Sequence, residues 1–440
     1  MALADGISRP TKARYLVLSA LFVVSSISFG DRAAMAVAGP AVSASLHLDP
    51  VAMGYILSGF AIAYVIAQVP GGALLDRYGT RWIYTGALAL WSLFTLLQGW
   101  TGLFSGASAA IFLFSMRFLE GMASAPAVPA NARIAASWFP SSERGLATAI
   151  FNSSQYFSLV AFAPLMGWLV HGFGWPWVFF VMGGLGLVTA AFLPMIVRSP
   201  LHSPLIDAAE LAYIERGGAL VHIERKSPVT HFTWHNVRQL IANRMLLGVY
   251  LGQYCVGVLT YFFVTWFPIY LVQQRGLSIL HAGMMTAVPA ICGFAGGIVG
   301  GVLSDEILRR TGSLTIARKA PILIGMTMAA LIVACNFTTS QVAVMVLMSM
   351  AFFGKGLAAL GWTVVSDVSP KELVGVTGGV FNTVGNIPGI VTPIVIGYIV
   401  ARLGSFDWAL AFVAAHCLIA ILAYFVVVPA IERLELKPAG

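Results

Sequence analysis

Five charged residues lie inside long apolar runs of the sequence: Asp31, Arg32, Arg117, Glu120 and Lys355. A charge at the centre of a membrane-spanning helix costs about 2.5–3.5 kcal/mol on insertion scales, so it normally faces a cavity, forms an ion pair or takes part in function. Arginine holds a carboxylate through two parallel hydrogen bonds, and acidic residues within spans relay protons. These residues therefore have the chemistry to bind an anion and to move protons.

The spacing leaves a structural interpretation open for each of them. Arg117 and Glu120 are three residues apart and hence neighbours on a helix, so a static ion pair is the alternative to substrate binding by Arg117. Asp31 and Arg32 are adjacent and point about 100° apart. We expect Asp31 to carry a proton and Arg32 to attract or gate an anion, with ion pairs across helices as the alternative. Lys355 could instead pack along apolar surface.

The composition indicates a helical scaffold in a membrane. Of 440 residues, 59% are hydrophobic and 10% charged, whereas soluble domains carry about 25% charged residues. A membrane-spanning helix needs about 20 mostly apolar residues. We expect an all-α membrane protein with twelve spans, at residues 15–42, 51–75, 81–100, 106–130, 144–170, 174–196, 244–272, 281–304, 318–337, 341–366, 372–401 and 406–429. The four cysteines lack metal-ligand spacing, so no metal or cofactor is expected.

The basic residues predict the orientation of these spans. Of 25 Lys and Arg residues, twenty fall on the side of the N-terminus and two, Arg275 and Arg402, on the other. Basic residues accumulate in cytoplasmic loops, so both termini are expected in the cytoplasm, and the net charge of +8 does not indicate nucleic-acid binding. The expected division is an N-terminal segment (1–14), a six-helix half (15–196), a cytoplasmic connector (197–243), a second six-helix half (244–429) and a C-terminal tail (430–440).

The two halves share a spaced motif. A proline, a glycine, a phenylalanine and an asparagine recur 230 residues apart, at Pro140, Gly145, Phe151 and Asn152 and at Pro370, Gly375, Phe381 and Asn382. Parallel six-helix repeats are the architecture of the major facilitator transporters. If Arg117 in one half bound one carboxylate and Lys355 in the other bound a second, a six-carbon diacid would bridge the halves and favour their closure.

The segment from Gly72 to Arg81 resembles the loop between helices 2 and 3 of the major facilitator superfamily. Asp76, Arg77 and Arg81 are expected to form a cytoplasmic charge network that holds one conformation, with Asp305 as the repeat equivalent of Asp76. Ordinary positive-inside topology is the alternative interpretation.

Longer stretches look like the anion:cation symporter family within this superfamily, and most like its bacterial glucarate and galactarate transporters. They are Gly30-Asp31-Arg32, the run from Tyr64 to Arg77, Asn131 to Pro140, Gly252 to Cys255, Phe353 to Gly356 and Gly378 to Asn382. The resemblance implies a major facilitator fold with the pocket between its halves.

Eight residues are expected to bind substrate on these grounds: Arg32, Tyr64, Arg117, Gln155, Gln253, Lys355, Trp362 and Asn382. Amides and a phenol pair with hydroxyl groups, and an aromatic face covers a carbon chain. Polar packing between helices is the alternative for the residues that rest on resemblance alone.

One position departs from the family. Relatives usually carry a glutamate before the Ala-Pro pair of helix 4, where it acts with the helix 1 aspartate in proton coupling; Ser124 stands there. A serine carries no proton between pH 5 and 8. An engineered substitution that locks one state, transfer of the role to Glu120, and altered coupling all remain open. We assign proton coupling to Asp31, Glu120 and the position of Ser124. Phe29 also departs, because relatives often have tyrosine there.

These patterns predict a monomeric secondary active transporter of the bacterial inner membrane, not an enzyme. It is expected to import a glucarate- or galactarate-class sugar acid with protons by alternating access, with the lipid bilayer and no nucleic acid as further partners. The alternatives are an exporter of organic anions or drugs with the same fold and an importer of another hexonate or hexuronate. A membrane sensor or an intramembrane enzyme is disfavoured, since no nucleophile with a base or metal cluster is evident.

Overall fold

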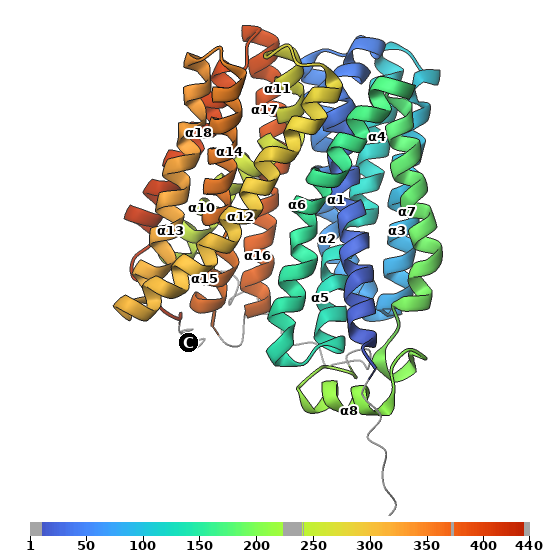
Figure 1. Ribbon diagram of the computed structural model, residues 1–440, viewed down its shortest axis with the longest axis vertical. Helices are drawn as coiled ribbons and strands as arrows, with labels where there is room; N and C mark the ends of the chain where they lie inside the picture. Colours follow the sequence, from blue (N-terminus) through green and yellow to red (C-terminus); the bar gives the residue numbers. More distant parts are fainter. Residues whose placement is uncertain (1–10, 223–239, 241, 371–373, 435–440) are drawn as a thin grey trace, which may run out of the picture.

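The computed structural model describes residues 11–222, 240, 242–370 and 374–434. Within these residues the chain forms helices joined by short turns, without strands. The helices run nearly parallel in two bundles that lie side by side (Figure 1). The predicted all-helical membrane class is confirmed.

The first bundle comprises α1 (Ala13–Leu46), α2 (Pro50–Tyr78), α3 (Thr80–Gln98), η1 (Gly99–Leu103), α4 (Gly106–Ser124), α5 (Ala127–Trp138), α6 (Ser141–Phe173) and α7 (Pro176–Ile196). The connector that follows contains η2 (Pro200–His202) and α8 (Ala208–Arg216).

The second bundle comprises α10 (Arg244–Tyr261), η3 (Phe262–Trp266), α11 (Phe267–Gln273), α12 (Ile279–Thr311), α13 (Leu314–Ala330), η4 (Leu331–Phe337), α14 (Gln341–Leu357), α15 (Gly361–Val368), α16 (Val374–Asn386), α17 (Pro388–Leu403), α18 (Asp407–Leu422) and η6 (Ala423–Val427). Several of these run on into one another as single crossings, such as α14 and α15.

Eleven described segments are long and apolar enough to cross a membrane. The twelfth expected crossing is α3, whose apolar character is diluted by Arg81 near its start and Gln98 at its end. At 19 residues it is still about 28 Å long, close to the hydrocarbon thickness of a bilayer. It packs against α4 and α7 and runs alongside the other helices (Figure 1).

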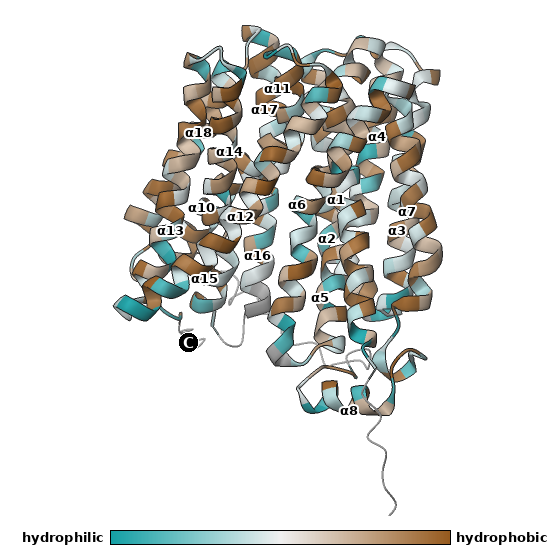
Figure 2. Ribbon diagram, viewed as in Figure 1, coloured by the Kyte–Doolittle hydropathy of each residue, from teal (hydrophilic) through white to brown (hydrophobic). Residues whose placement is uncertain are grey.

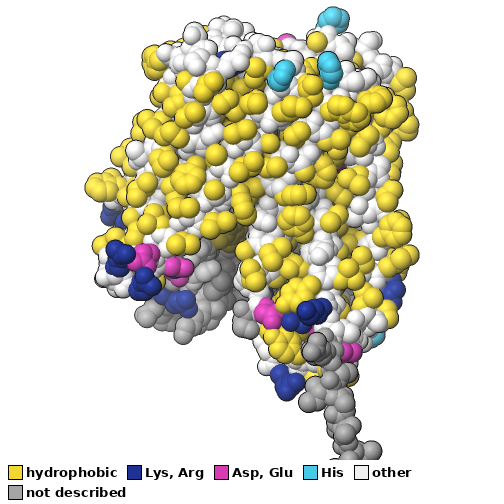
Figure 3. Space-filling view, viewed as in Figure 1, with side chains coloured by type: hydrophobic (Ala, Val, Ile, Leu, Met, Phe, Trp, Pro, Cys, Tyr) yellow, Lys and Arg dark blue, Asp and Glu magenta, His cyan; other side chains and the backbone are white. Residues whose placement is uncertain are grey.

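The outer surface fits a lipid environment. Apolar residues dominate the sides of both bundles (Figure 2), and charged side chains on the face seen in Figure 3 gather at the end that carries α8. We call this the connector end and its opposite the far end. Thr11 lies at the connector end, where its backbone N–H donates to Asp207 just before α8, and Leu434 donates its backbone N–H to the carbonyl of Val368, the last residue of α15.

Besides the packing of α1 against α11, η3 and α12, two helix pairs make the largest contacts between the halves: α2 with α17 and α6 with α12. Each crosses at a pair of glycines near the far end. A Cβ atom built on Gly54 would lie 2.6 Å from the Pro393 carbonyl oxygen, and one on Gly397 would lie 3.3 Å from Gly54 Cα. In the other pair, a Cβ on Gly283 would lie 3.1 Å from Gly167 Cα. The backbones touch, so only glycine fits at these crossings.

Repeat symmetry relates the two crossings. Gly54 and Gly283 are separated by 229 residues, and Gly167 and Gly397 by 230, the spacing of the sequence repeat. At the connector end the halves are parted by a notch, which Figure 3 shows in space-filling form. The molecule is therefore closed at the far end and open at the connector end.

The connector is attached to the first half through a buried carboxylate. The Glu210 side chain in α8 is fully buried and accepts hydrogen bonds from the backbone N–H groups of Ala13 and Arg14, at 2.9 and 3.3 Å. It caps the N-terminus of α1, whose first N–H groups have no partner within the helix. Arg14 also pairs with Glu210 at 2.8 Å and with Glu143 of α6 at 3.0 Å.

Prolines interrupt two crossings close to the interface between the halves. Pro126 separates α4 from α5, and Pro388 begins α17 just after α16 ends. Pro129 lies within α5, whereas Pro164 and Pro393 lie inside α6 and α17 without ending them. Interrupted helices line binding sites in many transporters.

Candidate functional site

A cavity of about 270 Å³ lies between the two halves. Its first-half wall comes from α1 and α6, and its second-half wall from α10, α14, α15 and α16. The polar and charged side chains on its wall are Arg32, Gln155, Tyr156, Gln253, Thr260, Tyr261, Lys355, Trp362, Asn382 and Asn386. No aspartate or glutamate is among the described residues that line it. The cavity is thus polar and cationic.

Arg32 reaches the cavity from the middle of α1, held by aromatic rings. Its guanidinium carbon lies 5.0 Å from the ring centre of Phe29, 4.7 Å from that of Phe60 and 5.1 Å from that of Tyr64. Cation–π contacts of this kind are worth about 0.5–2 kcal/mol each and do not neutralise the charge. No carboxylate lies within ion-pairing distance of Arg32 in the described part of the chain.

Lys355 enters the cavity from α14 in the opposite half. Its side chain is buried, and its Nζ donates a long hydrogen bond of 3.5 Å to the Tyr156 hydroxyl of α6. The same atom lies 5.2 Å from the ring centres of both Tyr156 and Phe352. Among the described residues it also has no acidic partner. A buried ammonium group in such surroundings calls for an anion.

Arg117, which the sequence predicts to bind a substrate carboxylate, is not among the residues that line the cavity in this conformation. It is buried within the first half and pairs with Glu120 at 3.1 Å. Gln98 Nε2 donates to the same carboxylate at 2.9 Å, and Arg117 Nη1 also reaches the backbone carbonyl of Asp31 at 3.4 Å. The i,i+3 pair, left open by the sequence, is present, and Arg32 occupies the wall instead.

Asp31 lies behind Arg32, buried in the first half. Neither of its carboxylate oxygens makes a hydrogen bond of ordinary geometry with a described residue, although the indole N–H of Trp91 lies close enough to interact with the carboxylate. Glu120, Arg117 and Arg32 lie near enough to act on it electrostatically. An unpaired carboxylate in an apolar interior is unfavourable in its ionised form, whereas a protonated one is not.

The position of Ser124 adjoins this group of charges. Its buried hydroxyl donates a hydrogen bond of 2.8 Å to the backbone carbonyl of Glu120, one turn earlier in α4. The Ser124 side chain therefore bonds to the backbone of its own helix. Tyr64 is also buried off the wall, stacked on Phe60 with ring centres 5.7 Å apart, so it supports Arg32 from behind.

The remaining predicted binding residues line the cavity. Gln155 faces Gln253 and Asn382 from the other half, and Trp362 lies half-exposed with its ring 5.0 Å from that of Phe381. Sequence reasoning missed several further wall residues. They are Tyr156, Thr260, Tyr261 and Asn386.

The spacing of residues along a helix could have identified one of these missed wall residues. Asn386 lies four residues after Asn382, on the same helix face, and its Nδ2 donates to the Asn382 carbonyl at 2.8 Å. Tyr261 donates to Asn386 Oδ1 at 2.9 Å. Tyr156 adjoins Gln155 and gave no separate signal.

The predicted gating residues lie at the connector end. Arg77 and Arg81 stack on Tyr78 and Trp82, at 5.2 and 4.7 Å from the ring centres. The side chain of Asp76 falls outside the part of the chain that is described.

In the second half a charge cluster joins three helices. Arg318 of α13 lies 3.7 Å from Asp305 of α12 and 2.8 Å from Asp367 of α15, and it also donates to Ser304 at 2.7 Å. This places Asp305 in a network of the expected kind, although it is exposed and its contact is long.

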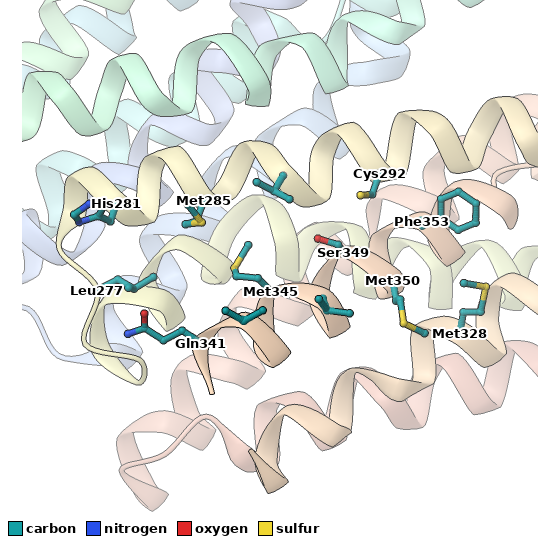
Figure 4. Close-up of a pocket in the computed structure, with 13 residues that line it drawn as sticks. Leu277, His281, Met285, Cys292, Met328, Gln341, Met345, Ser349, Met350 and Phe353 are labelled. Carbon is teal, nitrogen blue, oxygen red and sulfur yellow. The ribbon is translucent and has the colours of Figure 1, made fainter. Parts of the chain in front are cut away.

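A larger cavity, of about 740 Å³, lies elsewhere (Figure 4). It is an open groove on the outer side of the second half, formed by α12, α13 and α14, and Met285, Met328, Met345 and Met350 line it. Its described lining carries no Lys, Arg, Asp or Glu. This chemistry suits lipid chains and not an anion, so the smaller cavity between the halves is the candidate site.

Comparison with known proteins agrees with this geometry. The family model described as Major Facilitator Superfamily matches residues 21–393. The chain is 51% identical to the probable galactarate/D-glucarate transporter GudP of Escherichia coli (strain K12), over 99% of this chain and 98% of that protein. Its counterpart of the same name in Bacillus subtilis (strain 168) is 53% identical over 98% of this chain and 95% of the relative.

A solved structure shares the fold. The crystal structure of a D-xylose-proton symporter superposes with a TM-score of 0.72 at 16% identity, covering 95% of this chain and 99% of that one. The family match spans most of the chain and includes both halves. The chain therefore belongs to the Major Facilitator Superfamily of membrane transporters.

Proposed function

We propose that this chain imports a six-carbon sugar diacid of the galactarate or D-glucarate class across the bacterial inner membrane, together with protons. Relatives more than 50% identical over nearly their whole length carry that substrate in their names. The observation that carries the proposal is the cavity between the halves, where Arg32 and Lys355 present two cations that have no acidic partner among the described residues.

The rest of the wall suits a polyol chain. Gln155, Gln253 and Asn382 offer paired donors and acceptors for hydroxyl groups, and Trp362 offers an aromatic face to the carbon chain. A drug exporter would need a larger and more apolar cavity than one of about 270 Å³ lined in this way.

Transport proceeds by alternating access between the halves, proposed as residues 15–196 and 244–429 with the connector 197–243 between them. With the connector end in the cytoplasm, as the basic loops favour, both termini are cytoplasmic and the notch opens inward. The glycine crossings close the outer side. Substrate binding would draw the halves together around the cavity, and a monomer suffices because the cavity lies within one chain.

Protons are proposed to enter through Asp31, with Glu120 as its neighbour. Asp31 is buried without an ion-pair partner among the described residues and with only the Trp91 indole N–H close to its carboxylate, which favours its protonated form in this conformation. Glu120 is already paired with Arg117 and Gln98 and is therefore less free to exchange a proton. Ser124 contributes no titratable group.

Uptake of radiolabelled galactarate and D-glucarate into proteoliposomes tests the proposal, with and without an inward proton gradient. We expect gradient-driven accumulation of at least one acid. Asp31→Asn should abolish accumulation yet retain exchange of external for internal substrate, and Ser124→Glu tests whether a second carboxyl group changes the proton dependence. The absence of saturable uptake of both acids by folded protein would refute the substrate assignment.

A further inference from the structure

We infer that the cavity selects its cargo by charge: it occludes dianions because one carboxylate neutralises Arg32 in the first half and the other neutralises Lys355 in the second. The inference rests on the proposed function, and it identifies Lys355 as the residue that separates diacids from monoacids. A hexonate, which has a carboxylate at one end and a hydroxymethyl group at the other, would leave one cation without a counter-ion.

The placement of the two cations carries the argument. Arg32 reaches the cavity from α1 and Lys355 from α14, so each half contributes one. Both are surrounded by aromatic rings, and in the part of the chain that is described neither has a carboxylate within ion-pairing distance. A substrate with two carboxylates supplies a counter-ion for each of these cations, whereas a substrate with one carboxylate supplies only one negative charge for the two.

The other charged residues near the cavity do not neutralise Arg32 or Lys355. Arg117 and Glu120 cancel each other as a buried pair at 3.1 Å. Asp31 lies behind Arg32, and once it has taken up the proton assigned to it under the proposed function it adds no charge. The group of five then carries a net charge of +2, which a dianion reduces to zero. A monoanion leaves +1 and a neutral alditol leaves +2.

Closure of the halves around the substrate makes an unneutralised cation costly. While the notch is open, water and ions can screen an unneutralised cation, but occlusion removes them and leaves a buried charge that is strongly unfavourable. Discrimination should therefore act on the exchange rate as well as on binding. A hydrogen-bonded contact to a charged group is worth about 10- to 150-fold in affinity or rate.

Tyr156 acts as the positioning residue for Lys355. Its hydroxyl lies 3.5 Å from Nζ, and its ring lies against the same ammonium group from the opposite half. It directs the lysine toward the interface. A carboxylate that binds Lys355 would therefore bridge to the Tyr156 hydroxyl, and the second charge of the substrate would contact both halves.

Substrate exchange in proteoliposomes without a proton gradient tests the inference, using galactarate, galactonate and galactitol as probes. Wild type should exchange galactarate about 10- to 150-fold faster than galactonate and galactitol least. Lys355→Gln should slow galactarate exchange by a similar factor and should speed galactonate exchange, because a monoanion then leaves no cation without a counter-ion; exchange of galactonate also shows that the variant is folded. Lys319→Gln is the matched control, because Lys319 lies on α13 and contacts the Val428 carbonyl away from the cavity.

Tyr156→Phe keeps the ring and removes the hydroxyl. It should raise the KM for galactarate and leave that for galactonate unchanged, an asymmetry that a purely structural role would not produce. The inference is overturned if Lys355→Gln slows both acids equally or leaves their ratio at the wild-type value. Absence of galactarate exchange in wild type would instead refute the proposed function, so the two failures are distinguishable.

Discussion

The glycine crossings at the far end predict how the conformational equilibrium can be shifted. Gly283→Ala would place a Cβ atom 2.7 Å from the Ala163 carbonyl oxygen and 3.1 Å from Gly167 Cα. Ordinary contacts begin at 3.4 Å, so α12 and α6 must separate by several tenths of an ångström. Both obstacles are backbone atoms, which no side-chain rotation can remove.

The free-energy cost of Gly283→Ala follows from this steric overlap. Overpacking of a well-packed contact costs about 1–3 kcal/mol, and each 1.4 kcal/mol is a tenfold change in an equilibrium constant. The crossing exists while the far end is closed, so the penalty falls on this conformation. We expect Gly283→Ala to shift the population about 5- to 150-fold toward the state that is open at the far end.

Distances between spin labels across the far end measure this shift. Labels at the exposed positions Ser105 and Thr339 report the separation of the two halves there, in a background where the partly accessible Cys292 is replaced. Gly283→Ala should move the distribution to longer distances. Gly297→Ala is the matched control, since it lies on the same helix and its Cβ would meet no atom within 4 Å.

The same distribution of label distances for Gly283→Ala and Gly297→Ala would refute this prediction. A shift of the Gly283→Ala distances to shorter values would refute it as well. The repeat-related change Gly54→Ala should act in the same direction, because its Cβ would lie 2.6 Å from the Pro393 carbonyl oxygen. An effect at one crossing without the other would show that the two pairs do not open together.

Three further predictions concern the buried charges and the connector. Glu210→Ala should lower stability by about 1–3 kcal/mol, because it removes the acceptor of the first N–H groups of α1 and leaves Arg14 paired with Glu143 alone; thermal melting in detergent measures this, with the exposed Glu215→Ala expected to have little effect. Glu120→Leu should abolish transport and destabilise the first half by about 3–5 kcal/mol, since Arg117 keeps its charge without a counter-ion; a melting temperature equal to wild type would contradict this. Hydrogen bonds from the backbone N–H groups of Glu210 and Thr11 lower the pKa of Asp207 below its usual value near 3.8, so the stabilisation is present above that pH and is lost as pH falls through the lowered pKa; the protection of the Glu210 amide against exchange, relative to its intrinsic rate at each pH, should fall only below pH 3.8.

Much of the fold was predictable because a bilayer restricts spanning segments to long apolar helices. The interruption at Pro126 could be read from the residue type, as could that before Pro388. The π-helical turn at Phe262–Trp266 could not, because no residue in it signals a wider turn. The close backbone contacts at Gly54 and Gly283 were likewise hidden, since many glycines of the chain meet nothing nearby.

The candidate site was predictable in composition but not in orientation. A charge within an apolar run indicates function or pairing, and the sequence left both open for Arg117. The structure turns Arg117 toward Glu120 and Gln98, and Arg32 toward the cavity, because a helix face is decided by neighbouring helices that the sequence does not place. Lys355 was identified from its depth, whereas Tyr156 needed the packing of α6 against the second half.

The modest hydropathy of α3 bears on how the protein is made. This helix ends at Gln98, whose side-chain amide donates a hydrogen bond to the Glu120 carboxylate on α4, the next crossing. During synthesis α3 would leave the translocation channel before α4 exists to cover it, and its polar end groups weaken its hold on the lipid. Stable insertion of α3 should therefore wait for α4, and the two would enter the bilayer as a hairpin, with the amide–carboxylate bond formed during biogenesis.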